Sequence, residues 1–318
     1  MVVEFFAQLV FAFGVTAPIF VLVALGIALK QHKFVDSTFT NSASKLVFNI
    51  CMPTMLFFAM VNTDIRATLD FPYLGVALSG TLLLFILFSL VAPIVVTEKR
   101  DRGVFVQGAF RSNLAIIGLA FCLNAYGEEG LAKGSVLMSV VTVFYNILSI
   151  YTLSSSLSDK KTSFFSLFSG VLKNPLILGI MTGIGVNLIQ LPVPSFAATA
   201  GEYVARMTLP LALICIGASL SLSEFRSSSV VSVVAVFAKL IVMPTAMLIG
   251  AYWIGFPQTE MGILFLMMSA PSVAAGYVMV QAMGGNDRLA ANIIVLSTLA
   301  SIVTVSVGLA VLKQMGIA

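Results

Sequence analysis

The sequence is poor in charged residues, which make up 9% of its 318 positions. A soluble protein of this length carries about a quarter. Hydrophobic residues make up 59% of the chain, and the mean hydropathy is +1.06. Too few polar side chains are present to coat a globule in water, so the composition predicts an integral membrane protein whose main partner is the lipid bilayer. The net charge of +4 is small and dispersed, and it gives no support for nucleic-acid binding.

Histidine and cysteine are also scarce. The only histidine is His32, and the three cysteines, Cys51, Cys122 and Cys215, all lie in apolar runs. Their spacing suggests neither a metal site nor a disulfide framework, so they are expected to be small buried hydrophobes. The apolar runs contain no Ser-His pair, no pair of aspartates and no HExxH motif. We therefore expect no cofactor, no metal and no catalytic site.

Long apolar runs dominate what is present. A helix needs about 20 apolar residues to cross the hydrocarbon layer. The first run is too long, and with Glu4 too acidic at its start, for a cleavable signal peptide. The connecting loops are short and leave no room for a soluble domain. Ten runs are expected to span the membrane: 5–29, 40–62, 72–96, 104–126, 131–156, 168–190, 203–222, 228–254, 259–283 and 288–313.

The basic residues in the loops predict the orientation. The loops after odd-numbered runs hold Lys30, Lys33, Lys99, Arg100, Arg102, Lys160, Lys161, Lys173, Arg226 and Arg288, whereas the other loops and the termini hold Arg66, Lys133 and Lys313. Because cytoplasmic loops are enriched in Lys and Arg, the odd loops are expected in the cytoplasm. Both termini then face the periplasm.

Prolines and glycines indicate a weak internal repeat with an offset of 157 residues. The matching pairs are Pro18 with Pro175, Gly26 with Gly183, Pro53 with Pro210 and Gly127 with Gly284, while Pro93 and Pro244 are shifted by an indel of about six residues. We therefore predict one repeat at 1–156, a short cytoplasmic loop at 157–167 and a second repeat at 168–318. Five spans in each half would make the second repeat inverted, a design typical of secondary transporters.

The fourth and ninth runs make poor continuous helices. The ninth contains Ser269, Pro271, Ser272 and Gly276, and the fourth contains Arg111-Ser112-Asn113 at the matching depth. Proline cannot donate to the helical ladder, and glycine adds flexibility. Two breaks in these runs would bring unwound segments together near the membrane centre. Half-helix N-termini there would attract an anion. An ordinary proline kink is the alternative for each run.

Four basic residues fall within the apolar runs: Lys45, Arg111, Arg206 and Lys239. Lys45 is near a helix end and is expected to extend to the surface. Arg206, the repeat counterpart of Asn49, is also near an end. A charge in the bilayer centre is costly unless it is paired or hydrated. The sequence offers no obvious buried carboxylate for Arg111 or Lys239, so a substrate carboxylate is one candidate partner. The alternative is that Arg111 reaches the cytoplasmic face.

Several segments carry a resemblance to a known family: "ICMPTMLF" (50–57), "FRSNLAIIGLAF" (110–121), "LPLALICIGASL" (209–220), "KLIVMPTAML" (239–248) and "SAPSVAAGYVMVQAMGG" (269–285). Over its whole length the chain resembles the auxin efflux carrier family, which includes plant auxin carriers and bacterial permeases for malate or malonate. The resemblance implies ten helices in two inverted five-helix repeats, a scaffold domain, a transport domain, and broken fourth and ninth helices that cross at the substrate site.

The resemblance also assigns residues and marks departures. Asn113 and Gly118 keep the spacing of the plant motif, in which the asparagine binds the substrate carboxylate. Ser112 stands where the plant carriers have proline, and Ala120 departs in the same way, so a sharp break in the fourth run is less favoured. The short loop at 157–167 resembles prokaryotic members and indicates a bacterial inner membrane.

The leading hypothesis is a secondary transporter of small organic anions, either a uniporter or weakly coupled to protons. The alternatives are a sodium-coupled symporter of bile-acid-carrier-like fold and a metabolite receptor that transports nothing. Asn113, Asn146, Ser269, Ser272 and Gln281 could supply oxygens to sodium. A homodimer is compatible with the sequence. The expected substrate-binding residues are Arg111, Ser112, Asn113, Gly118, Ser269, Pro271, Ser272, Gly276, Asn49, Asn146 and Lys239.

Overall fold

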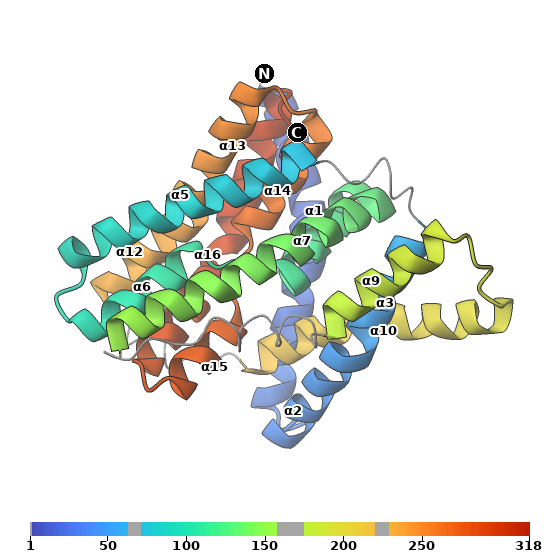
Figure 1. Cartoon of the computed structure of the whole chain (residues 1–318), viewed down its shortest axis with the longest axis horizontal. Helices are drawn as coiled ribbons and strands as arrows, with labels where there is room; N and C mark the ends of the chain where they lie inside the picture. The colour runs from blue at the N-terminus through green and yellow to red at the C-terminus, as the bar shows by residue number, and fades with distance from the viewer. Residues whose placement is uncertain (1, 63–70, 158–174, 220–228) are drawn as a thin grey trace.

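The computed structural model describes residues 2–62, 71–157, 175–219 and 229–318. These residues form helices joined by short turns, and no β-strand occurs among them (Figure 1). Seven helical segments within these ranges are long and apolar enough to cross a membrane, and Pro175–Leu188 (α9) is a shorter apolar helix. An all-helical membrane protein, as the composition predicts, is therefore confirmed. The predicted loop at 157–167 lies, after Leu157, outside the described residues.

Four of the seven segments are single helices. They are α1 (Val2–Gln31), α5 (Phe71–Val95), α10 (Ser195–Ser219) and α16 (Asp287–Gln314). A fifth segment ends with α7 (Leu119–Leu157), which has a non-helical backbone at Gly127 with φ of 60°. At this positive φ a glycine is the residue that fits without strain. The kink divides α7 into a short part before Gly127 and a long part that runs from Gly127 to Leu157.

The other two segments each contain one π-helical turn. α2 (Ser37–Leu46) continues through η1 (Val47–Cys51) into α3 (Met52–Val61), and α12 (Val230–Phe237) continues through η3 (Ala238–Val242) into α13 (Met243–Ile254). In both cases a Met-Pro pair, at Pro53 and Pro244, follows the π turn. Proline removes an N–H and crowds the carbonyl four residues before it. A widened turn before the ring lets the helix continue, and π turns of this kind are frequent at functional sites.

Two helices are broken, as the sequence predicts. α6 (Lys99–Phe110) ends before three non-helical residues, 111–113, and the chain resumes as η2 (Leu114–Gly118). α14 (Gln258–Ser269) ends before residues 270–273 and is followed by α15 (Ala274–Ala282). The two breaks meet in an isolated antiparallel bridge between Ser112 and Ser272. The first break therefore forms without a proline.

The helices gather into two groups. α1, α3, α9 and α10 pack on one another, and α3, α9 and α10 lie together at one side of the molecule in Figure 1. The second group contains the two broken helices with α5, α7, α12, α13 and α16. Small residues allow close approach within the first group, because a Cβ added at Gly183 would lie only 2.6 Å from the carbonyl oxygen of Phe57. Such small-residue contacts are common between membrane helices.

Hydrogen bonds connect helix ends to neighbouring turns at two places in the second group. Arg100 donates to the carbonyl oxygen of Gly284, and Asn286 donates to Asp101. At another place, the side-chain amide of Gln258 donates to the carbonyl oxygen of Gly316, near the C-terminus. The N-terminal region of α6 therefore lies beside the turn before α16, and the N-terminal region of α14 lies beside the C-terminus.

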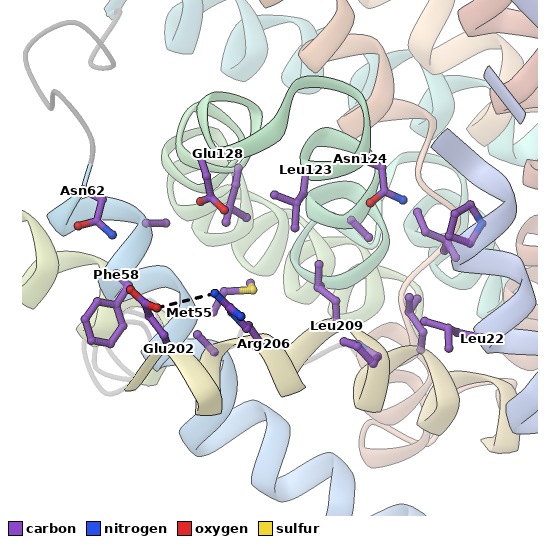
Figure 2. A pocket seen from close by; sticks show the side chains of 18 residues that line it. Leu22, Met55, Phe58, Asn62, Leu123, Asn124, Glu128, Glu202, Arg206 and Leu209 are labelled. Atoms are coloured by element: carbon purple, nitrogen blue, oxygen red, sulfur yellow. Dashed lines mark ion pairs between the residues drawn. The ribbon is translucent and has the colours of Figure 1, made fainter. Parts of the chain in front are cut away.

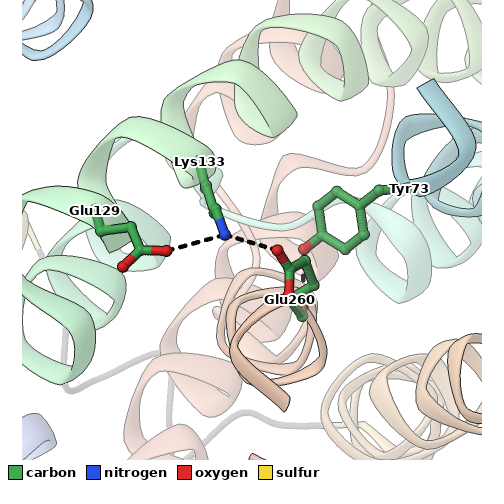
Figure 3. A network of polar contacts seen from close by, with 4 residues as sticks. All are labelled: Tyr73, Glu129, Lys133 and Glu260. Atoms are coloured by element: carbon green, nitrogen blue, oxygen red, sulfur yellow. Dashed lines mark hydrogen bonds and ion pairs between the residues drawn. The ribbon is translucent and has the colours of Figure 1, made fainter. Parts of the chain in front are cut away.

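An ion-pair network joins α7 to the first turn of α14. The ammonium of Lys133 lies 2.6 Å from Glu260 and 2.9 Å from Glu129 (Figure 3). The hydroxyl of Tyr73 in α5 donates to the backbone carbonyl of Glu260 at 3.0 Å. Glu260 is well placed, since an acidic side chain in the first turn of a helix is favoured by the helix dipole. The network thus connects α5, α7 and α14.

Candidate transport site

The two breaks satisfy each other's backbone groups. The N–H of Asn113 donates to the carbonyl oxygen of Pro271 at 2.7 Å. The hydroxyl of Ser272 donates to the carbonyl oxygen of Gly108 at 2.8 Å. The hydroxyl of Ser112 donates to the carbonyl oxygen of Met268 at 3.3 Å. Backbone groups released at a helix end need partners where water is excluded. This exchange allows two non-helical segments to persist inside a membrane protein.

A buried lysine closes the end of α14. Lys239 is 0% exposed, and its ammonium donates to the carbonyl oxygen of Met268 at 2.5 Å. The last carbonyls of a helix carry partial negative charge, so a cation is favoured there. The hydroxyl of Tyr145 donates to Ser112 at 3.4 Å, and the hydroxyl of Ser269 is buried with no partner in the described part of the chain. Lys239 therefore finds a partner within the chain, although no carboxylate supplies it.

Asn113 begins the helical turn after the first break. Its side-chain oxygen accepts from the N–H of Ile116 at 3.4 Å, which makes it the N-cap of η2. Its side-chain nitrogen has no acceptor in the part of the chain that the structure describes, and the residue is 4% exposed. Gly118 ends the turn, and its N–H donates to the backbone oxygen of Asn113 at 2.9 Å. A Cβ at Gly118 would lie 2.9 Å from the sulfur of Met267, so the glycine allows η2 to approach α14.

Arg111 lies inside the helix bundle and not at its surface. Its side chain is 6% exposed, and it donates to Asn146 at 2.7 Å and to Ser149 at 3.0 Å. Both partners are on α7. A third contact joins a guanidinium nitrogen to the sulfur of Met279 at 2.9 Å. Arg111 makes no ion pair with any residue in the described ranges. Because only neutral groups contact this buried guanidinium, its positive charge is not neutralised by them and can attract an anion.

The structure brings most of the predicted site residues together. Seven of them surround the contact between the two breaks: Ser112, Asn113, Gly118, Ser269, Pro271, Ser272 and Lys239. Arg111 and Asn146 pair beside it, and Gly276 in the first turn of α15 lines a small cavity with Arg111. Asn49 is not among them, because it is exposed on η1 and its amide donates to the carbonyl oxygen of Lys45.

A larger pocket lies between the two groups of helices. Its volume is about 510 Å³, and it is lined by α1, α3 and α10 on one side and by residues of α7 before and after the Gly127 kink on the other (Figure 2). Ligand pockets commonly measure about 300–1,000 Å³. The lining is mostly apolar. The first α7 residue in it is Ala120, two residues after η2 ends. The pocket therefore continues from the same segment that forms the first break.

The polar side chains of the pocket include one cation. Arg206 extends into it from α10, and its guanidinium lies 3.9 Å from the carboxylate of Glu202 one turn earlier (Figure 2). The two side chains are 78% and 51% exposed, so this pair contributes little to stability. Glu128, Asn62 and Asn124 also line the pocket. Sequence reasoning identified Arg206 as a basic residue within a span but missed the other four. The signal in the sequence was Glu202 followed one turn later by Arg206 at the start of an apolar run, which could have indicated a polar site there.

Comparison with known proteins supplies the family. The model of a family described as "Membrane transport protein" matches residues 11–166 and 160–309. An uncharacterised transporter of Methanothermobacter thermautotrophicus is 22% identical over 288 residues, which cover 90% of this chain and 93% of the relative. An uncharacterised transporter of Methanocaldococcus jannaschii is 23% identical, covering 91% and 94% of the two chains. The uncharacterised transporter YfdV of Escherichia coli O157:H7 is 21% identical, covering 93% and 96%.

These matches span both broken helices, the pocket and the whole length between them. The chain belongs to the membrane transport protein family that includes the auxin efflux carriers.

Proposed function

We propose that this protein is a secondary carrier that moves small organic anions by alternating access, with the pocket of Arg206 as its substrate chamber. The observation that carries the proposal is a largely apolar pocket of about 510 Å³ that lies between two groups of helices and contains one cation. Transporters bind substrate between structural units that move relative to one another. A chamber shared by both groups would change its exposure when one group moves against the other.

Ten membrane crossings in two inverted repeats fit this proposal. The seven long segments, the shorter α9 and the broken α14–α15 pair account for nine of them, and α6 with the start of α7 adds a tenth when α7 is divided at Gly127. The ranges that the family model matches, 11–166 and 160–309, divide near the boundary between the proposed repeats at 1–156 and 168–318. The loop contacts at the ends of α6 and α14 are also compatible with termini in the periplasm of a bacterial inner membrane.

Arg206 is the proposed anchor for the substrate carboxylate. Its loose pair with Glu202 can open at small cost, because both side chains are exposed to the pocket. Glu128 and Glu202 also line the pocket, and their carboxylates would limit how tightly an anion binds to Arg206.

The contact between the two breaks forms the deeper part of the proposed path. The free side-chain nitrogen of Asn113 can donate to a carboxylate, and Ser112, Gly118, Ser269, Pro271 and Ser272 shape its surroundings. Lys239 and Arg111 add positive charge nearby. No group of three acidic, histidine or cysteine side chains that could hold a metal ion occurs in the described residues. The sodium-coupled alternative would instead use asparagine and serine oxygens, and Arg111 and Lys239 beside the breaks would repel a sodium ion there.

Uptake into proteoliposomes tests the proposal. Small carboxylates are first screened for a ligand that raises the melting temperature of the purified protein. Uptake of that ligand is then measured for the wild type, Arg206→Gln and the control Lys30→Gln, which changes an exposed lysine at the end of α1. We expect Arg206→Gln to lower affinity by about tenfold, since it removes a bond to a charged group in a partly exposed site. Unchanged uptake in Arg206→Gln, or an equal loss in Lys30→Gln, contradicts this assignment.

A further inference from the structure

Two buried donors share one weak acceptor next to the first break. Arg111 is 6% exposed and Gln107 is 3% exposed, and both lie on the last turns of α6 and its cap. A guanidinium nitrogen of Arg111 lies 2.9 Å from the sulfur of Met279, and the amide nitrogen of Gln107 lies 3.9 Å from the same atom. A thioether is a poor hydrogen-bond acceptor. No oxygen acceptor for the Gln107 amide is found in the described part of the chain.

These donors line a small cavity. Its volume is about 20 Å³, and Gln107, Gly108 and Arg111 line it together with Ser272, Gly276 and Ile293. A cavity needs about 10–15 Å³ to hold one water molecule. By this measure the cavity has room for one water-sized group, and none of its lining residues lines the larger pocket of Arg206.

The electrostatics of the cavity favour an anion. Ser272, Val273 and Gly276 belong to the segment that opens α15, so the positive end of this nine-residue helix adjoins the cavity. The guanidinium of Arg111 adds a full charge, which the hydroxyl of Ser149 and the amide oxygen of Asn146 solvate but do not neutralise. An unneutralised guanidinium in a membrane protein is costly. A bound anion would offset that cost.

We propose that this cavity binds one small inorganic anion of the size of chloride, held by Arg111, Gln107 and the N-terminus of α15. Met279 contacts both donors without lining the cavity, so the anion would compete with its sulfur for these donors, and movement of this flexible side chain would enlarge the cavity to the size of chloride. The anion lies where α6, α15 and α16 meet, so its presence stabilises the helices that carry both breaks. The cavity shares no lining residue with the pocket of Arg206, although Arg111 and Ser272 also belong to the deeper part of the proposed path, and the inference holds whether or not Arg206 anchors a substrate.

Thermal unfolding of the purified protein tests the site. The melting temperature is measured while chloride replaces gluconate at constant ionic strength. We expect a saturable rise with chloride and with bromide. The rise should be lost in Arg111→Gln and in Gln107→Leu, and kept in Lys30→Gln. A rise that does not saturate, or that persists in both cavity variants, overturns the proposal.

Met279→Leu provides a second test that does not depend on the folding of the Arg111 variant. Leucine has similar volume but removes the competing sulfur, so we expect chloride to bind severalfold more tightly. Equal chloride affinity in Met279→Leu and wild type would show that the sulfur does not compete with an anion. Stabilisation by formate or acetate, but never by halides, would assign the cavity to a carboxylate and contradict the inorganic anion proposed here. Bromide bound beside Arg111 in an anomalous diffraction map would support it directly.

Discussion

The ammonium of Lys239 lies 2.5 Å from the carbonyl oxygen of Met268, so a fully buried cation closes the end of a broken helix. The hydroxyl of Ser112, which lies on the other broken helix, donates to the same oxygen. Met268 therefore joins three segments that are far apart in the sequence. This arrangement places positive charge beside the contact between the two breaks, with no acidic partner among the residues that the structure describes.

Lys239→Met should separate stability from transport. Lys239 has no ion-pair partner in the described residues, so Lys239→Met leaves no uncompensated charge, and Ser112 would still donate to Met268. We therefore expect the melting temperature to stay within a few degrees, a change of about 1 kcal/mol or less. Uptake should fall, because the bare end of α14 would repel an anion. A large loss of melting temperature together with normal uptake in the folded fraction would assign Lys239 a structural role alone.

Asn113 can be tested with two substitutions. Asn113→Ala removes the free amide that is proposed to bind a carboxylate, so affinity should fall by about ten- to a hundredfold. Asn113→Asp retains an N-cap for η2 but puts a negative charge beside the anion, and we expect it to bind even more weakly. Ligand binding by the purified variants is the measurement. Normal affinity in Asn113→Asp would limit this residue to capping.

The two acids beside Lys133 should differ in their effect on stability. Glu260 is 15% exposed and joins two helices, whereas Glu129 is 63% exposed and lies one turn from Lys133 on the same helix. Glu260→Ala should lower the free energy of unfolding by about 1–2 kcal/mol, because it breaks a shielded, charge-assisted bond. Glu129→Ala, the matched control, should cost about 0.5 kcal/mol or less. Equal melting temperatures for the two variants would refute this ranking.

Uptake should persist when sodium is replaced by potassium, because Arg111 and Lys239, the buried cations beside the two breaks, would repel a sodium ion there. Glu128→Gln should raise the affinity for an anionic substrate, because it removes a negative charge from the wall of the pocket. Collapse of uptake without sodium would favour the symporter alternative.

The proposed topology places residues 99 and 315 on opposite faces of the membrane. Lys99→Cys and Met315→Cys put single reactive thiols at the start of α6 and just after α16. The native cysteines are buried and should contribute little background. In right-side-out spheroplasts an impermeant maleimide should label position 315 and leave position 99 unlabelled until lysis. Labelling of both positions before lysis is incompatible with inverted repeats.

The sequence by itself determined the membrane character, the all-helical class and the positions of both breaks. These follow from local properties: apolar runs long enough to span the hydrocarbon, and polar or proline-containing interruptions at 111–113 and 269–272. The residues around the breaks, such as Ser112 and Ser272, could be named for the same reason. The departure from proline at Ser112 made the first break harder to predict, since that break depends on partners in the second.

Only the tertiary structure decided how the buried cations are satisfied and where the pocket lies. Arg111 pairs with Asn146 and Lys239 with Met268, across separations of 35 and 29 residues. The pocket of Arg206 combines side chains from four helices. No local pattern encodes such contacts, because they depend on which helix faces pack together. A buried charge takes whichever oxygen the packed bundle brings within reach, and a cavity remains where the packed side chains fail to meet.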